Sequence, residues 1–101
     1  MSVLLELSLF PVDQGASLSR FVAPIVDLIA ASGHPYQLTA MGTIVETEAL
    51  SEALTLIDQA YQLLAAQGAQ RVYANAKFDI RDGVSGRLSA KVASVERQRQ
   101  S

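Results

Sequence analysis

Alternating apolar and polar positions mark the middle of the chain, at residues 36–46, as a pair of extended segments. Apolar and polar side chains alternate over residues 36–41, which is the period of a half-buried strand. Gly42 supplies the conformational freedom of a tight turn, and the β-branched run at residues 43–45 favours a second strand. The pattern therefore predicts a β-hairpin.

Two further extended segments lie near the ends of the chain. Residues 3–10 place valine and leucine on one side and a mixed set of side chains on the other. Residues 71–81 alternate small or apolar side chains with charged, amide and tyrosine side chains, and Asp82-Gly83 ends the run. One apolar face and one mixed face are typical of strands that cover a core on one side only. We therefore predict one strand near the start of the chain and another toward its end.

After the first strand, the apolar positions recur with the 3.6-residue period of an amphipathic helix. This helix is predicted to begin after Ser17 or Ser19, either of which can cap it, and to end at Gly33. Pro24 lies inside the pattern, removes one backbone hydrogen bond and is expected to bend the helix. The apolar stripe consists of Leu18, Phe21, Val22, Ile25, Leu28 and Ile29.

The helical period returns after the hairpin and again near the end of the chain. The second helix is predicted to have Thr47 or Ser51 as its cap and Gly68 at its end. A short third helix is predicted over residues 88–98. The residues expected to face inward are Leu54, Ile57, Tyr61 and Leu64 in the second helix and Leu88, Val92 and Val95 in the third.

The order of these elements repeats a strand–helix–strand unit. Residues 28–33 resemble residues 63–68, and a strand follows each of them closely. Two such units joined by the hairpin form the ferredoxin-like split β-α-β arrangement, βαββαβ, which is an α+β fold. Right-handed crossovers place two helices on one face of a four-stranded antiparallel sheet, with the strand order last, first, third, second. We expect residues 1–101 to form a single domain, with a short C-terminal helix.

Composition narrows the class of protein. Half of the 101 residues are hydrophobic and 18% are charged, which is apolar for so small a domain and favours an oligomer. The net charge of −2 leaves no basic field, so we expect no nucleic-acid partner. Without cysteine the chain has no disulfide and no thiol nucleophile. It also lacks a signal-peptide pattern and an apolar run of the ~20 residues that cross a bilayer, so we expect a cytoplasmic protein and no membrane partner.

The sheet face that the helices leave uncovered is expected to carry a mixture of side chains. A hydrated face is more uniformly polar than this one, in which aromatic rings accompany single carboxylates, an amide and an amine. The mixture suits a small-molecule site where a few polar groups converge, and it suits a contact between the sheets of two subunits. Glu6 and Lys77 can also simply pair across neighbouring strands. The face comprises Leu4, Glu6, Ser8, Phe10, Tyr73, Asn75, Lys77 and Asp79.

Candidate catalytic and metal-binding groups are sparse. His34 lies in a predicted turn before Pro35, where no neighbour in the sequence orients it as a base. The sequence contains no metal-ligand motif and no phosphate-binding glycine loop. We therefore predict that the protein is not an enzyme and needs neither a metal nor a cofactor. The alternative to this prediction is an enzyme that acts on a small heteroaromatic substrate and uses Glu6 or Asp79 as its base.

Three segments, taken together, resemble a known family. They are SLSRFV at residues 17–22, YQLTAMGTIVE at residues 36–46, and KFDIR at residues 77–81 followed by KVASV at residues 91–95. Their order and spacing resemble the small thiamine-binding-protein family over nearly the whole chain. The resemblance implies a ferredoxin-like fold whose sheets pack face to face in dimers, with the dimers pairing into a homotetramer. It also implies binding of thiamine or its hydroxymethylpyrimidine moiety without catalysis.

The same resemblance implies which residues lie near the ligand. Two residues depart from the family pattern: Pro24 lies in a helix that usually has no proline, and Phe21 stands where tyrosine is common. Both departures put the details of the first helix in question more than the fold. To the motif positions we add three residues of the uncovered face, because a carboxylate favours a thiazolium cation and an aromatic ring favours a flat pyrimidine. The predicted ligand-binding residues are Ser19, Thr39, Met41, Gly42, Thr43 and Glu46 from the motifs and Glu6, Tyr73 and Asp79 from the face.

The leading prediction is that the protein binds a small molecule without catalysis. The protein itself is predicted to self-associate as a dimer or tetramer. The runner-up is an oligomeric interaction protein whose uncovered face serves assembly only. The sequence leaves open whether the ligand is thiamine, a phosphorylated form or the pyrimidine alone. It also leaves open whether the role is storage, delivery or sensing.

Overall fold

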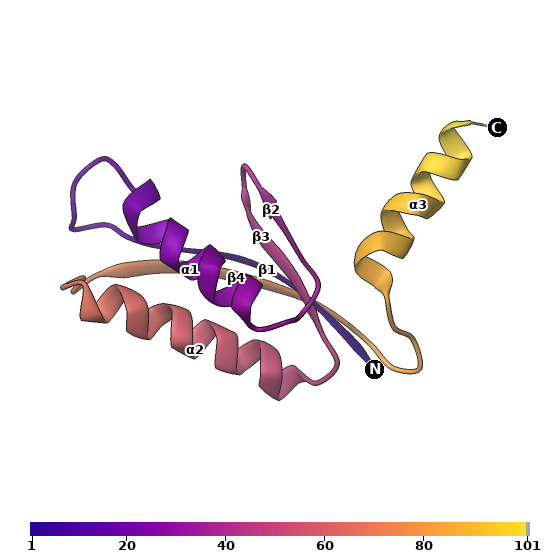
Figure 1. Ribbon diagram of the computed structural model, residues 1–101, viewed down its shortest axis with the longest axis horizontal. Helices are drawn as coiled ribbons and strands as arrows, with labels where there is room; N and C mark the ends of the chain where they lie inside the picture. The colour runs from indigo at the N-terminus through magenta and orange to yellow at the C-terminus, as the bar shows by residue number, and fades with distance from the viewer. Residues whose placement is uncertain (101) are drawn as a thin grey trace.

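The computed structural model describes residues 1–100 and confirms the predicted order of elements (Figure 1). Strands and helices alternate as the duplicated strand–helix–strand pattern requires, and a further helix follows the last strand. The elements are β1 (Ser2–Pro11), α1 (Ser19–Ala31), β2 (Tyr36–Thr39), β3 (Gly42–Thr47), α2 (Leu50–Ala66), β4 (Val72–Arg81) and α3 (Arg87–Arg99).

The sheet has the strand order β2-β3-β1-β4, and every neighbouring pair is antiparallel, as predicted. Residue Glu6 of β1 lies opposite Lys77 of β4 and opposite Ile44 of β3. Phe10 of β1 lies opposite Tyr73 of β4. Because side chains alternate between the faces of a strand, this register gathers the predicted mixed residues on one face.

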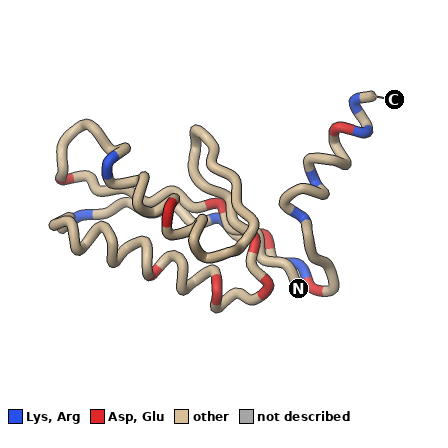
Figure 2. The backbone as a smooth tube through the Cα atoms, viewed as in Figure 1, with Lys and Arg blue, Asp and Glu red and all other residues tan. Residues whose placement is uncertain are grey.

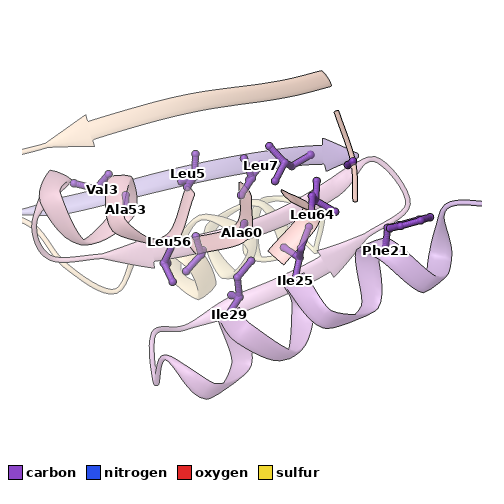
Figure 3. Close-up of a cluster of buried hydrophobic side chains, with 13 residues drawn as sticks. Val3, Leu5, Leu7, Phe21, Ile25, Ile29, Ala53, Leu56, Ala60 and Leu64 are labelled. Atoms are coloured by element: carbon purple, nitrogen blue, oxygen red, sulfur yellow. The ribbon is translucent and has the colours of Figure 1, made fainter. Parts of the chain in front are cut away.

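Helices α1 and α2 lie together against the other face of the sheet, where the core forms (Figure 3). Leu5, Ile29 and Leu64 are fully buried there, and replacing any of them with alanine would cost about 2–5 kcal/mol of stability. The core comprises Val3, Leu5, Leu7, Leu9, Phe21, Ile25, Ile29, Val45, Ala53, Leu56, Ala60, Leu64 and Ala69. Both helices therefore shield one side of the sheet, and the opposite side stays open.

The starts of the two core helices differ from the predicted caps. α1 begins at Ser19 itself, and neither Ser17 nor Ser19 caps it, since Leu18 occupies the N-cap position without a side-chain hydrogen bond. The helix also continues through Pro24. At α2 the N-cap residue is Ala49, whose backbone N–H donates to the Glu52 carboxylate at 2.9 Å. A helix start can be satisfied by a carboxylate three residues into the helix, so the predicted hydroxyl cap is not required.

The N-cap predictions for α2 also placed Thr47 and Ser51 in a role that neither has. Thr47 is the last residue of β3, and its hydroxyl donates to the Ala49 carbonyl at 2.9 Å. Ser51 lies inside the helix, one residue after its start. The strand β3 therefore runs almost directly into α2.

The predicted helix ends are confirmed. Gly33 follows α1 and Gly68 follows α2, with positive φ angles of 82° and 92°.

The hairpin turn lies one step earlier than predicted. Thr39 pairs with Gly42, so Ala40 and Met41 form the two-residue turn and Gly42 is the first residue of β3. The Thr39 hydroxyl accepts the Met41 N–H at 3.1 Å and donates to the Gly42 carbonyl at 2.8 Å. Gly42 has a φ of 146°, and a Cβ there would lie 2.9 Å from the Leu7 carbonyl oxygen. Glycine is therefore needed for the close approach of β3 to β1.

Helix α3 projects from the end of the sheet rather than joining the core (Figure 1). The sequence predicted that its apolar stripe faces inward. In the structure Val92 is 55% exposed and Val95 is 59% exposed. The predicted helix is confirmed, but the prediction that its apolar stripe faces inward is wrong. The stripe cannot reach the core, because α1 and α2 fill it.

Candidate functional site

A pocket of about 570 Å³ lies on the open face of the sheet, over the ends of β1 and β4 farthest from α3. Small-molecule sites commonly have volumes of ~300–1,000 Å³, so this hollow is large enough for a bicyclic-sized ligand. It is lined by Glu6, Ser8, Phe10, Met41, Val72, Tyr73, Ala74 and Asn75.

Two aromatic rings form one wall of this open-face pocket. The centroids of the Phe10 and Tyr73 rings are 6.2 Å apart with 49° between their planes, and the two residues are cross-strand partners. The Arg71 guanidinium lies 5.4 Å from the centroid of Tyr73 and donates to its hydroxyl at 3.2 Å. Tyr73 is nevertheless 53% exposed, so its ring is free to contact a flat ligand.

Polar groups lie next to the aromatic wall. Ser8 and Asn75 face each other across β1 and β4, and Glu6 and Lys77 are the next cross-strand pair on the same face. Glu6, Ser8 and Asn75 line the pocket. Within residues 1–100 the ion pairs do not join Glu6 to Lys77, although the sequence suggested that they pair. The Glu6 carboxylate is therefore available to a cationic ligand.

Met41 closes the side of the pocket nearest the hairpin. Its position in the two-residue turn leaves the side chain 82% exposed. A thioether on a flexible stem adapts to irregular apolar shapes and contacts aromatic rings favourably. Met41 also borders a second hollow, on the other face of the sheet.

The second hollow, of about 320 Å³, lies between α1 and the hairpin on the helix-covered side. Thr39, Gly42 and Thr43 line it, together with apolar side chains that include Ile25 and Ile29. Thr43 is opposite Leu7 of β1, which belongs to the core, and only 5% of Thr43 is exposed. The hairpin motif residues therefore do not all meet the residues of the uncovered face, because alternation along β3 turns Thr43 away from it.

Glu46 lies at the opposite end of the open face, where it holds the start of α3. Its carboxylate accepts the Ser2 hydroxyl at 2.5 Å and the backbone N–H groups of Arg87 and Leu88 at 3.0 Å each. Burial by itself raises the pKa of Glu46, but these three hydrogen bonds and the Arg87 charge together hold the pKa below its ordinary value. A carboxylate at a helix N-terminus also matches the helix dipole.

Asp79 belongs to the same anchor of α3. The Arg87 guanidinium pairs with the Asp79 carboxylate at 2.9 Å and donates to the Asp79 carbonyl at 2.6 Å. Arg87 also donates to the hydroxyl and the carbonyl of Ser2, each at 3.0 Å. Hydrogen bonds from Arg87 and then from Lys91 lower the pKa of the Asp79 carboxyl. Glu46 and Asp79, which were predicted near the ligand, are thus engaged with α3.

The nine predicted ligand-binding residues consequently fall into separate places. Three of them line the open-face pocket, and four border the hollow beside the hairpin, with Met41 in both. Ser19 lies at the start of α1 in a shallow apolar hollow with Val22 and Leu38. The three residues in the open-face pocket are Glu6, Met41 and Tyr73.

Two arginines that matter to these sites were missed by sequence analysis. Arg87 is 6% exposed although arginine is rarely buried, and it joins β1, β4 and α3. Arg71 supports the Tyr73 ring at the edge of the pocket. The available signal for Arg87 was its position directly after Gly86, at the start of a predicted helix that needs a fixed first turn.

The part of the chain that the structure describes contains no group of three or more histidine, cysteine, aspartate or glutamate side chains placed to hold a metal ion. Among its helices, none is long and apolar enough to cross a membrane. The open-face pocket itself offers aromatic, amide, hydroxyl and carboxylate groups.

Comparison with protein families identifies the group to which this arrangement belongs. A family model described as thiamine-binding protein matches residues 5–96. The chain belongs to the thiamine-binding protein family. The predicted resemblance is thereby confirmed, since the match includes the whole hairpin, all of β4 and β1 from residue 5 onward.

Relatives of this thiamine-binding-family chain include UPF0045 proteins from distant organisms. One from Mycobacterium bovis is 36% identical over 97 residues, covering 96% of this chain and 94% of the relative. One from Methanothermobacter thermautotrophicus is 33% identical over 92 residues, covering 90% and 93%.

Solved structures agree with the fold. A hypothetical protein from Methanocaldococcus jannascii is 26% identical, with a TM-score of 0.81 over 94% of this chain and 96% of that one. A Thermotoga maritima protein described as a candidate for thiamine biosynthesis or salvage is 18% identical, with a TM-score of 0.75 over 92% and 99%. The predicted ferredoxin-like α+β fold is confirmed.

Proposed function

We propose that the protein is a non-catalytic binding protein for thiamine or its hydroxymethylpyrimidine moiety, and that the ligand lies in the open-face pocket. The observation that supports this most strongly is the meeting in one hollow of an aromatic wall, Phe10 and Tyr73, with the carboxylate of Glu6, which forms no ion pair within residues 1–100. The family to which the chain belongs makes thiamine the first ligand to test.

The chemistry of thiamine fits the side chains of the pocket. Its flat aminopyrimidine can stack against Tyr73 with Met41 on the open side. Ser8 and Asn75 offer donors and acceptors at fixed positions on rigid strands, which suits the amino group and ring nitrogens. The cationic thiazolium is favoured by the carboxylate of Glu6. The same groups offer no nucleophile held beside a base, which is why binding without turnover is proposed.

The proposal includes self-association in the cytoplasm, as a dimer or a homotetramer, with open faces in contact. An open pocket on one sheet would gain a lid from a second sheet packed against it, and water would be excluded from the ligand. A second candidate function, assembly without a ligand, is supported by the exposed aromatic Tyr73 near the start of the edge strand β4 on the same face.

A thermal melt with and without ligand tests the proposal. Thiamine at about 100 times its dissociation constant should add ~2.7 kcal/mol to stability. For a domain of this size that corresponds to a rise of about ten degrees or more in the midpoint. Thiamine monophosphate and hydroxymethylpyrimidine identify the preferred form, and the isolated thiazole alcohol is the control that lacks the pyrimidine.

The outcomes separate the candidate functions. An unchanged midpoint with every pyrimidine-containing compound would contradict the binding function and favour assembly alone. Recovery of the compound after incubation, checked by mass spectrometry, distinguishes binding from turnover. A product that forms only with the protein present would show that the chain is an enzyme.

A further inference from the structure

Lys77 carries a positive charge on the open face, next to the pocket. It is the cross-strand partner of Glu6, which lines the pocket, and alternation along β4 puts it on the same face as Tyr73 and Asn75. Figure 2 shows basic positions along β4, one of them next to an acidic position of β1 in the middle of the sheet. The Lys77 side chain is exposed, and it forms no hydrogen bond or ion pair within residues 1–100.

Glu6 and Lys77 are thus two opposite charges that stand side by side without pairing. Cross-strand partners of opposite charge are close enough to form an ion pair, and in the part of the chain that the structure describes this one does not form. Each charge therefore keeps its capacity for a ligand group of the opposite sign. Because neighbouring strands lie about 5 Å apart, the pair matches a ligand whose own cation and anion are separated by a similar distance.

A phosphate ester of thiamine is a ligand of this kind. Its parts occur in the order aminopyrimidine, thiazolium, phosphate, with a short ethyl chain between the thiazolium ring and the phosphate. When the pyrimidine stacks on Tyr73 and the thiazolium lies beside Glu6, the ester chain leaves on the side away from the pyrimidine, toward Lys77. A phosphate monoester carries a charge of about −1.5 to −2 at pH 7, and an ammonium group binds it as a point charge.

Arg71 is the other cation close to the pocket, and it is already engaged. Its guanidinium donates to the Tyr73 hydroxyl at 3.2 Å and lies 5.4 Å from the centroid of that ring. It also stands at the pyrimidine end of the proposed ligand. Lys77 is four residues from Tyr73 along β4, which is roughly 13 Å at the rise of a strand, toward the thiazolium end. Lys77 is therefore the cation placed to meet a phosphate.

We infer that the open-face pocket is selective for a phosphate monoester of thiamine, and that Lys77 is the residue that recognises the phosphate. The inference rests on the proposed function, because it uses the same pocket and the same position of the thiazolium. Glu6 by itself would disfavour the ester, since a carboxylate repels a phosphate. Lys77 reverses that preference by placing a positive charge on the neighbouring strand.

Isothermal titration calorimetry with thiamine and with thiamine monophosphate tests the inference on the wild-type protein. The quantity compared is the ratio of the two dissociation constants, so effects common to both compounds cancel. The monophosphate is expected to bind about two- to fivefold more tightly than thiamine, which is the range of an exposed ion pair.

Lys77→Gln removes the positive charge and should abolish this preference. The affinity for the monophosphate should fall by about two- to fivefold, while the affinity for thiamine should not fall, because a nearby cation opposes a thiazolium. A general loss of structure would weaken both compounds. Arg81→Gln is the matched control: it removes an exposed cation from the same face of the same strand, four residues farther from the pocket, and should leave the ratio unchanged. Lys77→Met repeats the test should Lys77→Gln fail to fold, which thermal melts without ligand detect.

The outcomes separate the inference from the proposed function. Thiamine binding with no preference for the monophosphate, or an unchanged preference in Lys77→Gln, would overturn the inference and leave the proposed function standing. A preference lost in Arg71→Gln and kept in Lys77→Gln would also overturn it, since the phosphate would then lie at the other end of the pocket. If wild-type protein bound neither compound, the proposed function and the inference would both be wrong.

Discussion

Glu6 and Glu46 show how two glutamates on one sheet face acquire different roles from their neighbours. Glu46 receives hydrogen bonds from Ser2, Arg87 and Leu88, which use both of its carboxylate oxygens. Glu6 lines the open-face pocket without an ion-pair partner among residues 1–100. Of the two, Glu6 is the carboxylate with free capacity for a cation.

Replacing Glu6 by glutamine should therefore weaken thiamine binding. The Glu6→Gln change keeps the size of the side chain and removes its charge, and a surface charge pair is worth about 1 kcal/mol or less, so we expect a loss of affinity of up to about fivefold. Hydroxymethylpyrimidine, which lacks the thiazolium cation, should lose less. Isothermal titration calorimetry measures both compounds. Asp58→Asn on α2, also the loss of one exposed carboxylate, is the control, and equal losses in both variants would contradict the role of Glu6.

Thr43 distinguishes the site expected from the sequence from the site that the geometry favours. The motif resemblance placed Thr43 near the ligand, but its side chain lies on the helix-covered face. For a ligand in the open-face pocket, Thr43→Val should change thiamine affinity by less than about twofold. A much larger loss, with the free energy of unfolding changed by only about 1 kcal/mol, would move the ligand to the hollow beside the hairpin. Calorimetry and urea denaturation measure the two quantities.

At the scale of elements, α3 is attached to the sheet mainly by polar contacts. Its first turn is fixed by the carboxylates of Glu46 and Asp79 and by the buried guanidinium of Arg87, whereas α1 and α2 are held by the apolar core. An attachment of this kind depends on charge and therefore on pH, and a hydrophobic attachment does not.

Acid should release α3 before it unfolds the domain. Because the folded-state pKa values of Glu46 and Asp79 lie below their ordinary values, the attached form binds fewer protons than the detached form. Their contribution is complete above about pH 5 and is lost as the pH falls below about 4. Hydrogen exchange of the Arg87 and Leu88 amides, followed from pH 7 to pH 3, should show early loss of protection.

A matched variant isolates the cause of this pH dependence. Glu46→Gln cannot titrate, and it offers only one acceptor oxygen to the three donors that contact Glu46. Its α3 amides should already exchange faster at pH 7, and the acid-dependent part should shrink. Protection that falls with pH equally in wild type and Glu46→Gln would show that Glu46 does not control the attachment.

At the scale of the whole molecule, hydrophobic periodicity was sufficient to predict the fold. Strand order, helix layer and the mixed face all follow from which side of each strand is apolar, and the register confirms them. The turn was misplaced by one step because Gly42 is required for its approach to Leu7 rather than for the turn itself. The cap of α2 was missed because the Ala49 N–H is satisfied by the Glu52 carboxylate instead of a hydroxyl, and that of α1 because Leu18 occupies the N-cap position without a side-chain hydrogen bond.

The candidate site was predictable only in part, for a different physical reason. Glu6 and Tyr73 were found because strand alternation assigns a face to every residue of β1 and β4. Arg87 was missed because its guanidinium contacts belong to two residues, Ser2, which is 85 residues away, and Asp79, which is eight residues away in another element. Hydrophobic periodicity does not indicate contacts of this kind. Thr43 was placed near the ligand because of the motif alone. The sheet face on which its side chain lies was not taken into account.

Met41 has a consequence for both sides of the sheet. Its side chain borders the open-face pocket and also the hollow between α1 and the hairpin. A methionine has three rotatable bonds and no branch, so it can swing from one hollow toward the other at little cost. A ligand that displaces the Met41 side chain from one hollow would therefore reduce the room left in the other.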